Sequence, residues 1–488
     1  MLASCEDMRI LFSPSYQLEL DPKQASNLEP YPPLGTLYAA ARLRLDGHEV
    51  QLSDSMLAQG LEEYRRDLDR FAPDLVAIYE DDFNYLSKMC LTNMRDAAFE
   101  KARLAKERQA FVAVHGSDVA DHIEDYLEGS ADAAILGEGE ETLAELVREL
   151  AGGSSKGLRS VAGLAFVADG ELVRTRPRAF VRDLDELPFP AWDLVDIARY
   201  RDAWHERHDG FSVNMVTTRG CPYHCNWCAK PIYGQRYAVR TPANVAKELD
   251  WLRNLVHPEH IWFADDIFGL KPGWVEEFAA EVESRNSITP FKIQARADLI
   301  DDRVAAALRR AGCKNVWLGA ESGSQKVLDA MEKGIRVDQI FHAAACLKAH
   351  GIRVSLFLQF GYPGEEWSDI EETMEMVRKA RPDDIGISVS YPLPGTPFYA
   401  RVQQDLAQKS NWAHSDDLDM MFRGTFAPDF YRALYKLVHS EFRLRRALRT
   451  LPRPTSAMRV VRNLARWIPA RVAVYTLSRR RNPVLQTS

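Results

Sequence analysis

The stretch Arg219-Gly-Cys-Pro-Tyr-His-Cys-Asn-Trp-Cys228 decides what kind of protein this chain forms. It places Cys221, Cys225 and Cys228 at the spacing C-x3-C-x2-C, with no fourth cysteine close by. A structural zinc site is closed by four protein ligands, and an ordinary iron–sulfur cluster takes four thiolates. Three thiolates on a four-iron cluster leave one iron open to a substrate or cofactor. The spacing therefore favours a metal cluster with an open coordination position.

Two simpler interpretations of the same residues stay open at this point. Cys225 and Cys228 form a C-x2-C pair, which alone would favour a redox pair or a zinc knuckle completed by a distant ligand such as His224. The x3 and x2 spacings together, with Trp227 directly before the third cysteine, disfavour both interpretations.

Length and composition are typical of a soluble globular protein with two or three domains. The chain has 488 residues, of which 46% are hydrophobic and 27% charged. No apolar run approaches the roughly 20 residues of a membrane span, and the N-terminus lacks a signal-peptide pattern. The odd number of cysteines, seven, argues against a disulfide framework, so Cys5, Cys90, Cys313 and Cys346 are expected to be small apolar residues. We expect a cytoplasmic protein.

Residues 1–150 alternate between strand and helix patterns. Short apolar runs at 9–13, 48–54, 74–79, 111–115 and 132–137 are separated by segments that favour helices, such as 32–43. This alternation predicts a doubly wound, Rossmann-like parallel sheet, whose ligands bind at the carboxyl ends of the strands. Glycine turns follow two of these strands, at His115-Gly-Ser-Asp118 and Leu136-Gly-Glu-Gly-Glu140, and glycine lets a large ligand approach the backbone.

A second pattern of strands and helices covers residues 206–400. A connector precedes it at 151–205, with a flexible turn at 152–155, a hairpin around Asp169-Gly170 and an extended, proline-containing linker. Six predicted strands then end in polar or glycine residues, at 211–217, 260–264, 291–295, 315–320, 354–360 and 385–390. The carboxyl ends of such strands form the active site of a parallel βα barrel.

The cysteine motif and the six strands resemble the radical S-adenosylmethionine (SAM) superfamily. The resemblance implies a four-iron four-sulfur cluster on the three cysteines, SAM bound to the open iron, and reductive cleavage of SAM to a 5′-deoxyadenosyl radical. It also implies an α/β fold with a six-stranded partial (βα)6 barrel. By position, the resemblance assigns SAM contacts to the following residues: Trp227, Asp265, Asp266, Arg296, Glu321, Gly361 and Pro392.

The N-terminal part resembles the cobalamin-binding domain that precedes the barrel in one class of radical SAM enzymes. The resemblance assigns cobalamin contacts to Leu34, Gly35, Gly116, Ser117, Gly137, Glu138 and Gly139. Met56 stands where many cobalamin domains carry a cobalt-binding histidine, so the lower axial ligand stays undetermined, and a degenerate domain that binds nothing is the alternative. The expected organisation is a cobalamin-binding domain at 1–150, the connector, the radical SAM core at 206–400 and a helical region at 401–488.

The C-terminal region carries an unusual charge pattern. After Glu441 there is no Asp or Glu but there are twelve Arg, although the whole chain has a net charge of −8. Apolar residues are interleaved with this arginine at roughly helical spacing. The segment is compatible with contact to an anionic membrane surface, with docking on the acidic body of the protein, or with a solvated tail. The acidic body argues against nucleic acid as a partner.

The function implied by these resemblances is hydrogen abstraction from an unactivated carbon of a small organic substrate, with C-methylation favoured. Residues 415–425 resemble the tail of the anaerobic magnesium-protoporphyrin monomethyl ester cyclase, so oxidative cyclisation is the alternative. A non-catalytic cobalamin or iron–sulfur sensor is a remote third option. Reduction would require an electron donor such as flavodoxin or ferredoxin.

Overall fold

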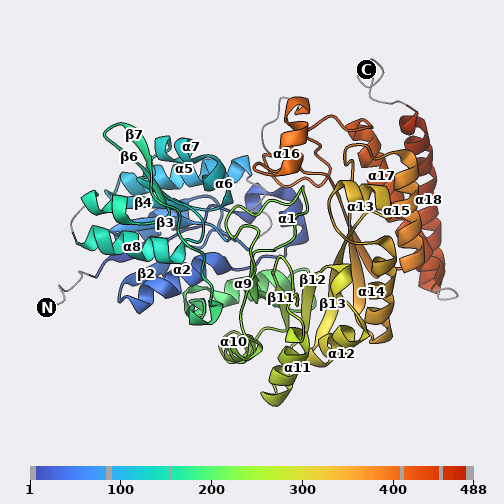
Figure 1. Ribbon diagram of the computed structural model, residues 1–488, viewed down its shortest axis with the longest axis horizontal. Coiled ribbons are helices and arrows are strands. Elements are labelled where there is room, and N and C mark those ends of the chain that lie inside the picture. Colours follow the sequence, from blue (N-terminus) through green and yellow to red (C-terminus); the bar gives the residue numbers. More distant parts are fainter. Residues whose placement is uncertain (1–6, 84–90, 153–154, 407–411, 450–453, 480–488) are drawn as a thin grey trace. The chain divides into compact units, whose positions relative to one another are not determined.

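The structure is a computed structural model that describes residues 7–83, 91–152, 155–406, 412–449 and 454–479 (Figure 1). Cys5, Cys90 and part of the glycine–serine turn lie outside these ranges. The described residues divide into two compact units. One comprises residues within Met1–Pro222, Lys230–Phe291 and Asn411–Ser415, and the other comprises residues within Tyr223–Ala229, Lys292–Ser410 and Asp416–Ser488.

The first unit contains a seven-stranded sheet with the order β2-β1-β3-β4-β5-β6-β7. Its strands are β1 Arg9–Phe12, β2 Glu49–Leu52, β3 Leu75–Tyr79, β4 Phe111–His115, β5 Ala133–Ile135, β6 Leu164–Ala168 and β7 Glu171–Arg174. β1 to β5 pair in parallel, and the hairpin β6–β7 adds two antiparallel strands. The strand order reverses between β1 and β3, which is where ligands of such sheets bind.

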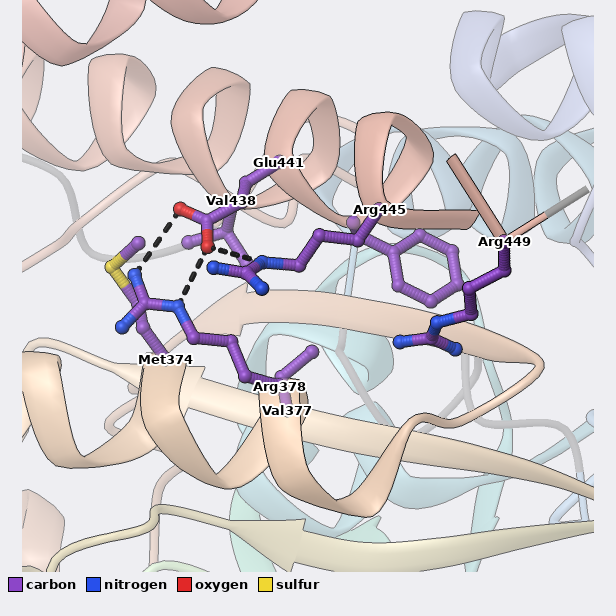
Figure 2. Close-up of a pocket in the computed structure, with 8 residues that line it drawn as sticks. Met374, Val377, Arg378, Val438, Glu441, Arg445 and Arg449 are labelled. Carbon is purple, nitrogen blue, oxygen red and sulfur yellow. Dashed lines mark hydrogen bonds and ion pairs between the residues drawn. The ribbon is translucent and has the colours of Figure 1, made fainter. Parts of the chain in front are cut away.

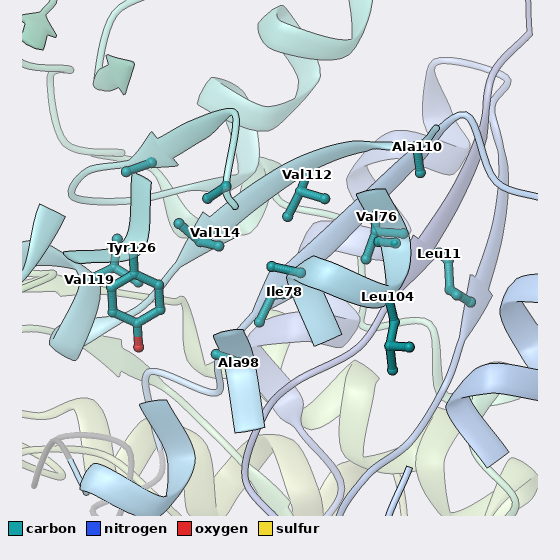
Figure 3. Close-up of a cluster of buried hydrophobic side chains, with 14 of the residues drawn as sticks. Leu11, Val76, Ile78, Ala98, Leu104, Ala110, Val112, Val114, Val119 and Tyr126 are labelled. Atoms are coloured by element: carbon teal, nitrogen blue, oxygen red, sulfur yellow. The ribbon is translucent and has the colours of Figure 1, made fainter. Parts of the chain in front are cut away.

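Helices cover both faces of this sheet, as in a doubly wound fold. They are α1 Pro22–Asn27, α2 Leu34–Leu45, α3 Glu62–Phe71, α5 Thr92–Lys106, α6 Ser117–Asp121, α7 Ile123–Glu128 and α8 Glu140–Ala151. Figure 3 shows one face, where Val76 and Ile78 of β3 and Val112 of β4 belong to the same buried cluster as Leu104 of α5. The alternate strand residues Ile10 and Phe12 are fully buried on the other face. Burial on both faces explains the nearly continuous apolar strand sequences.

A six-stranded sheet follows, with the order β15-β14-β13-β12-β11-β8. Its strands are β8 Ser212–Met215, β11 His260–Phe263, β12 Phe291–Ala295, β13 Cys313–Glu321, β14 Arg353–Phe360 and β15 Asp384–Val389. The helices of this part are α9 Ile197–His205, α10 Pro242–Leu255, α11 Trp274–Ser284, α12 Asp302–Ala311, α13 Gln325–Ala330, α14 Val337–Ala349, α15 Trp367–Ala380 and α16 Pro397–Val402. The six predicted strands are therefore confirmed, in chain order.

Two long helices, α17 Pro428–Arg449 and α18 Pro454–Ser478, end the second unit and pack against each other. The predicted helical C-terminal region is thus confirmed. Among the described residues, no helix is both long enough and apolar enough to span a bilayer.

Candidate active site

The cysteine loop begins and ends on a short antiparallel ribbon in the first unit. β9 Thr218–Arg219 pairs with β10 Ala238–Val239, so the ribbon closes the segment that carries the cysteines. Gly220 has φ +73°, and a Cβ there would lie 2.5 Å from the carbonyl oxygen of Arg236. Any larger residue would therefore push the two ends of the loop apart. The three thiols are partly exposed and form no disulfide.

Asn226 holds the middle of the loop within the second unit. Its side chain is fully buried: Nδ2 donates to the carbonyl oxygen of Ala330 (2.8 Å), and Oδ1 accepts from the hydroxyl of Tyr362 (2.9 Å). Its backbone N–H donates to Met331, and its carbonyl oxygen accepts from Phe398 N–H. Sequence reasoning missed Asn226. Its place between two expected metal ligands was the available signal.

Arg296, at the end of β12, lies beside the same loop. Its guanidinium lies 3.6 Å from the ring centroid of Tyr223, and Nη1 is 4.0 Å from Cys225 Sγ. Nη1 also donates to the carbonyl oxygen of Lys333, and Nε and Nη2 donate to Asp298. Arg296 therefore places a positive charge beside an expected cluster ligand, and its role as a SAM contact stays a prediction.

Glu321 ends β13 in a strained conformation. Its φ is +58°, in the left-handed region that residues other than glycine rarely adopt, and the strand register shifts between Gly319 and Glu321. Glu321 Oε1 accepts from Lys333 Nζ at 2.8 Å, and Lys333 lies 5.8 Å from the ring centroid of Trp227. Burial alone would lower the pKa of Lys333, but the charges of Glu321 and Cys225 raise it. A carboxylate, an ammonium and an indole thus meet next to the cysteine loop.

Asp265, at the end of β11, is buried in the first unit and already accepts four hydrogen bonds. They come from the backbone N–H groups and hydroxyls of Thr217 and Thr218, at 2.7–3.0 Å. Burial raises the pKa of Asp265 to about 6, although these hydrogen bonds act in the opposite direction. The contacts fix the end of β8 immediately before the cysteine loop. Asp266 is exposed.

The remaining predicted SAM contacts lie at the ends of β14 and β15. Gly361 has φ +82°, and its N–H donates to the buried carboxyl of Glu365 at 2.6 Å. Burial raises the pKa of Glu365 to about 8. Pro392 is buried after β15.

Buried polar groups lie at the carboxyl edge of the first sheet. Gly116 has φ +150°, and a Cβ there would lie 2.9 Å from Glu80 Cγ, so the chain passes tightly over that side chain. Glu80 Oε2 and Ser117 Oγ are buried, and neither has a hydrogen-bond partner. Open space surrounds Gly137, where an added Cβ would meet no atom within 4 Å. Unsatisfied buried polar atoms at the switch point of a parallel sheet fit a large polar ligand.

Other predicted cobalamin contacts at this edge already have protein partners. Glu138 and Glu140 both bind the buried guanidinium of Arg219, with Nη1 of Arg219 3.3 Å from Glu138 Oε1 and Nη2 2.5 Å from Glu140 Oε1. Gly35 N–H donates to Asp81, Leu34 is fully buried, and Gly139 packs against the ring of Tyr79.

His115 and Lys101 were missed by sequence reasoning. His115 stacks on Tyr79, donates Nε2–H to the carbonyl oxygen of Gly137 (2.9 Å) and is held neutral, since burial lowers its pKa to about 4. Lys101 Nζ is buried against Ser13, Ser55 and the carbonyl oxygen of Pro14. Burial lowers its pKa to about 8. His115 begins the glycine turn at 115–118 but was assigned no role, and Lys101 belongs to no sequence motif.

Among the described residues, no three His, Cys, Asp or Glu side chains converge on a point that one metal ion could occupy. This is consistent with the cysteine motif, because the thiolates of a four-iron cluster bind different iron atoms.

Residues 215–377 match the family model of the radical SAM superfamily. This segment contains the cysteine motif, the last residue of β8 and the complete strands β11, β12, β13 and β14. Residues 215–377 therefore form a radical SAM domain, which makes the chain an enzyme of that type. The family implies a four-iron four-sulfur cluster and SAM as cofactors, as the sequence predicted.

Curated relatives include methylases and a cyclase. An uncharacterized methyltransferase of Pyrococcus horikoshii is 27% identical, over 80% of this chain and 83% of its own. The hopanoid C-3 methylase of Methylococcus capsulatus is 25% identical, over 83% and 75%. The anaerobic magnesium-protoporphyrin IX monomethyl ester cyclase of Synechocystis is 26% identical, over 66% and 63%.

Two solved structures share the fold at 18% sequence identity. The cobalamin-dependent SAM radical enzyme OxsB, solved with aqua-cobalamin, matches with a TM-score of 0.74 over 96% of this chain and 72% of its own. The radical SAM methyltransferase TsrM from Kitasatospora setae, solved with cobalamin and a [4Fe-4S] cluster, matches with a TM-score of 0.66 over 82% and 75%. The predicted fold class is confirmed.

Proposed function

We propose that this enzyme is a cobalamin-dependent radical SAM methylase that acts on an unactivated carbon of a small organic substrate. The observation that carries the proposal is the three-cysteine loop, closed by the β9–β10 ribbon and held by Asn226. The methyltransferase and methylase relatives, which match 80% and 83% of the chain, favour methyl transfer.

In this proposal the cluster is held by Cys221, Cys225 and Cys228. The cluster would supply the single electron that cleaves SAM. The chain's own residues position the reactants. Asn226 fixes the loop, and Arg296 places a positive charge 4.0 Å from Cys225. The SAM contacts assigned to Trp227, Asp265, Asp266, Glu321, Gly361 and Pro392 are part of the proposal.

We place cobalamin at the carboxyl edge of the first sheet. Glu80 Oε2, Ser117 Oγ and the open space at Gly137 support this assignment, and cobalamin would supply the methyl group. His115 is an unsuitable cobalt ligand, because Nε2–H donates to Gly137 and Nδ1 lies 3.4 Å from Asp82.

An anaerobic assay tests the proposal. The reconstituted protein is supplied with cobalamin, SAM, a strong reductant and a cell extract as the source of substrate, and 5′-deoxyadenosine and S-adenosylhomocysteine are quantified. Comparable amounts of both are expected, because a methylase of this kind consumes two SAM molecules per turnover. The Cys225→Ala variant should form no deoxyadenosine, whereas Cys346→Ala, which changes a thiol on α14, should retain activity.

Oxidative cyclisation is the second candidate function, because the cyclase of Synechocystis matches 66% of the chain. It predicts deoxyadenosine without S-adenosylhomocysteine. Unchanged activity in Cys225→Ala would contradict both candidates, and absence of both products from the wild type would favour a sensor.

The proposal includes two further elements. An electron donor such as flavodoxin or ferredoxin reduces the enzyme, and the enzyme works in the cytoplasm with its C-terminal region at the inner face of the membrane.

A further inference from the structure

The outer surface of α18 carries a continuous stripe of exposed apolar side chains. Six of the eleven large apolar residues that are exposed among the described residues lie on this one helix: Met458, Val461, Leu464, Ile468, Val472 and Tyr475. Successive members are three or four residues apart, so they share one helix face. From Met458 to Tyr475 the stripe, hereafter the α18 stripe, is about 25 Å long. Its exposed fractions run from 37% at Leu464 to 75% at Met458.

The opposite face of α18 is already used inside the protein. Asn463, Ala470 and Val474 are buried, and α18 packs along α17. The indole Nε1 of Trp467 donates to Glu441 Oε2 at 3.4 Å. Because α18 is fixed by this inner face, the α18 stripe points away from α17.

Glu441 also ties α17 to the barrel helix α15 (Figure 2). Its carboxylate accepts from Arg378 Nε at 2.6 Å and from Arg445 Nε at 2.8 Å. Burial alone would raise the pKa of Glu441, but these arginines lower it, so the carboxylate stays ionised near neutral pH. Glu441 is the last acidic residue of the chain, and its charge is already neutralised by two guanidinium groups.

The charges of α18 itself are all positive. At about 100° per residue, Arg462 and Arg471 lie on the two sides of the stripe, whereas Arg459 and Arg466 lie closer to the buried face of the helix. All four are exposed, and α18 contains no Asp or Glu. An apolar stripe bordered by arginine is the pattern of a helix that lies in the interface of an anionic bilayer.

We propose that the α18 stripe docks the enzyme on an anionic lipid surface, with the apolar side chains in the interface and the arginines at the headgroups. A second copy of the chain is a poor occupant, since pairing two acid-free helices would bring only arginines together. The docking deepens the membrane location given under the proposed function by assigning its surface and its lipid chemistry. It is independent of the proposed methylation, because it uses none of the residues placed at the active site.

Vesicle co-sedimentation with the full chain tests the proposal. The protein is mixed with vesicles of phosphatidylcholine alone, or of phosphatidylcholine with phosphatidylglycerol. Binding to the anionic vesicles is expected, at least about tenfold stronger than to neutral ones and weakened by salt. Absence of binding to the anionic vesicles would overturn the proposal.

Two sets of variants separate the apolar and charge contributions. The triple variant Val461→Ser, Ile468→Ser, Val472→Ser should lose binding at least about tenfold. The matched control Leu45→Ser, Val167→Ser, Ile288→Ser changes three equally exposed apolar residues of the first unit and should bind like the wild type. The double variant Arg462→Gln, Arg471→Gln should bind the anionic vesicles weakly. The matched control Arg159→Gln, Arg207→Gln changes two exposed arginines outside α18 and should bind like the wild type.

Folding and oligomeric state are measured on the same samples. Thermal unfolding and iron content should match the wild type in every variant, because all the changed side chains are exposed. If the stripe variant still bound the vesicles, the α18 stripe would not be the docking surface. If the wild type were a dimer that ignored vesicles, and the stripe variant a monomer, the stripe would belong to a second copy and the proposal would be wrong.

Discussion

At the scale of single residues, the site depends on side chains that hold the cysteine loop as well as on the cysteines. Asn226 uses both side-chain polar atoms and both backbone polar groups to bind other residues of the second unit. Buried hydrogen bonds of this kind contribute modestly when formed and cost more when one partner is left unsatisfied. The loop conformation is therefore set by a residue that no metal-ligand pattern singles out.

Asn226→Ala should lower the free energy of unfolding by about 2–3 kcal/mol and reduce the iron retained after reconstitution. The substitution removes the hydrogen bonds of the Asn226 side chain to Ala330 and Tyr362, and the hydroxyl of Tyr362 keeps its bond to the carbonyl oxygen of Ala330. Chemical denaturation and iron analysis measure the two effects. Asn315→Ala removes the acceptor of the Ser355 hydroxyl near the amino ends of β13 and β14, and should leave the iron content unchanged. Full iron content in Asn226→Ala would contradict this role.

His115 should give the apoprotein a pH-dependent stability. Burial lowers its native pKa to about 4, below the unfolded value of about 6.5. Between these values the unfolded chain binds the proton and the native state does not, so stability falls as pH falls. Relative to His115→Gln, the wild type should lose about 1.4 kcal/mol per pH unit in this window. Urea unfolding at several pH values measures the difference, and parallel curves would show that His115 is protonated in the native state.

At the scale of elements, the ribbon β9–β10 closes the loop that carries the three cysteines. The two strands are only two residues each, so they pair over a very short ladder. The close approach of Gly220 to the carbonyl oxygen of Arg236 is what lets them pair. A Cβ at this position opposes the pairing directly.

Gly220→Ala should therefore destabilise the protein more than a positive φ alone explains. Gly170→Ala is the matched control, because Gly170 has φ +79° and an added Cβ there meets no atom within 4 Å. The control should cost about 1–2 kcal/mol from backbone strain. Gly220→Ala should cost more and should also lose iron, as measured by thermal unfolding and iron analysis. Equal effects in the two variants would argue against the steric explanation.

At the scale of the whole molecule, the proposed cofactor sites use different parts of the chain. The proposed cluster ligands lie in one loop, and the proposed cobalamin contacts lie at the carboxyl edge of the first sheet. The two groups have no residue in common, so each cofactor should bind without the other.

We predict that each of the two cofactors can be lost while the other stays bound. The variant with Cys221, Cys225 and Cys228 all changed to Ala should bind cobalamin but no iron. Gly137→Leu fills the open space beside Gly137 and should lower bound cobalamin at least about tenfold with normal iron. Gly170→Leu, at an equally open positive-φ position, should retain both. Cobalamin absorbance and iron content per chain measure the result, and loss of both cofactors in either test variant would contradict it.

The sequence by itself determined the architecture and the chemistry of the cluster. Alternating apolar strands and helices define both sheets because burial on two faces leaves a continuous apolar pattern, and the spacing of three cysteines is local. The sequence did not show which partners the assigned site residues have within the protein: Glu138 is paired with Arg219, and Arg296 is paired with Asp298.

The tertiary structure decided what depends on residues far apart in the chain. Asn226 meets Ala330 and Tyr362, and Lys333 meets Glu321 and Trp227, although no local pattern links them. The same holds for the two faces of α18, since the inner face can be told from the outer one only when α17 covers it. Periodicity shows that a helix has an apolar face, but packing against its neighbours determines which apolar residues stay exposed.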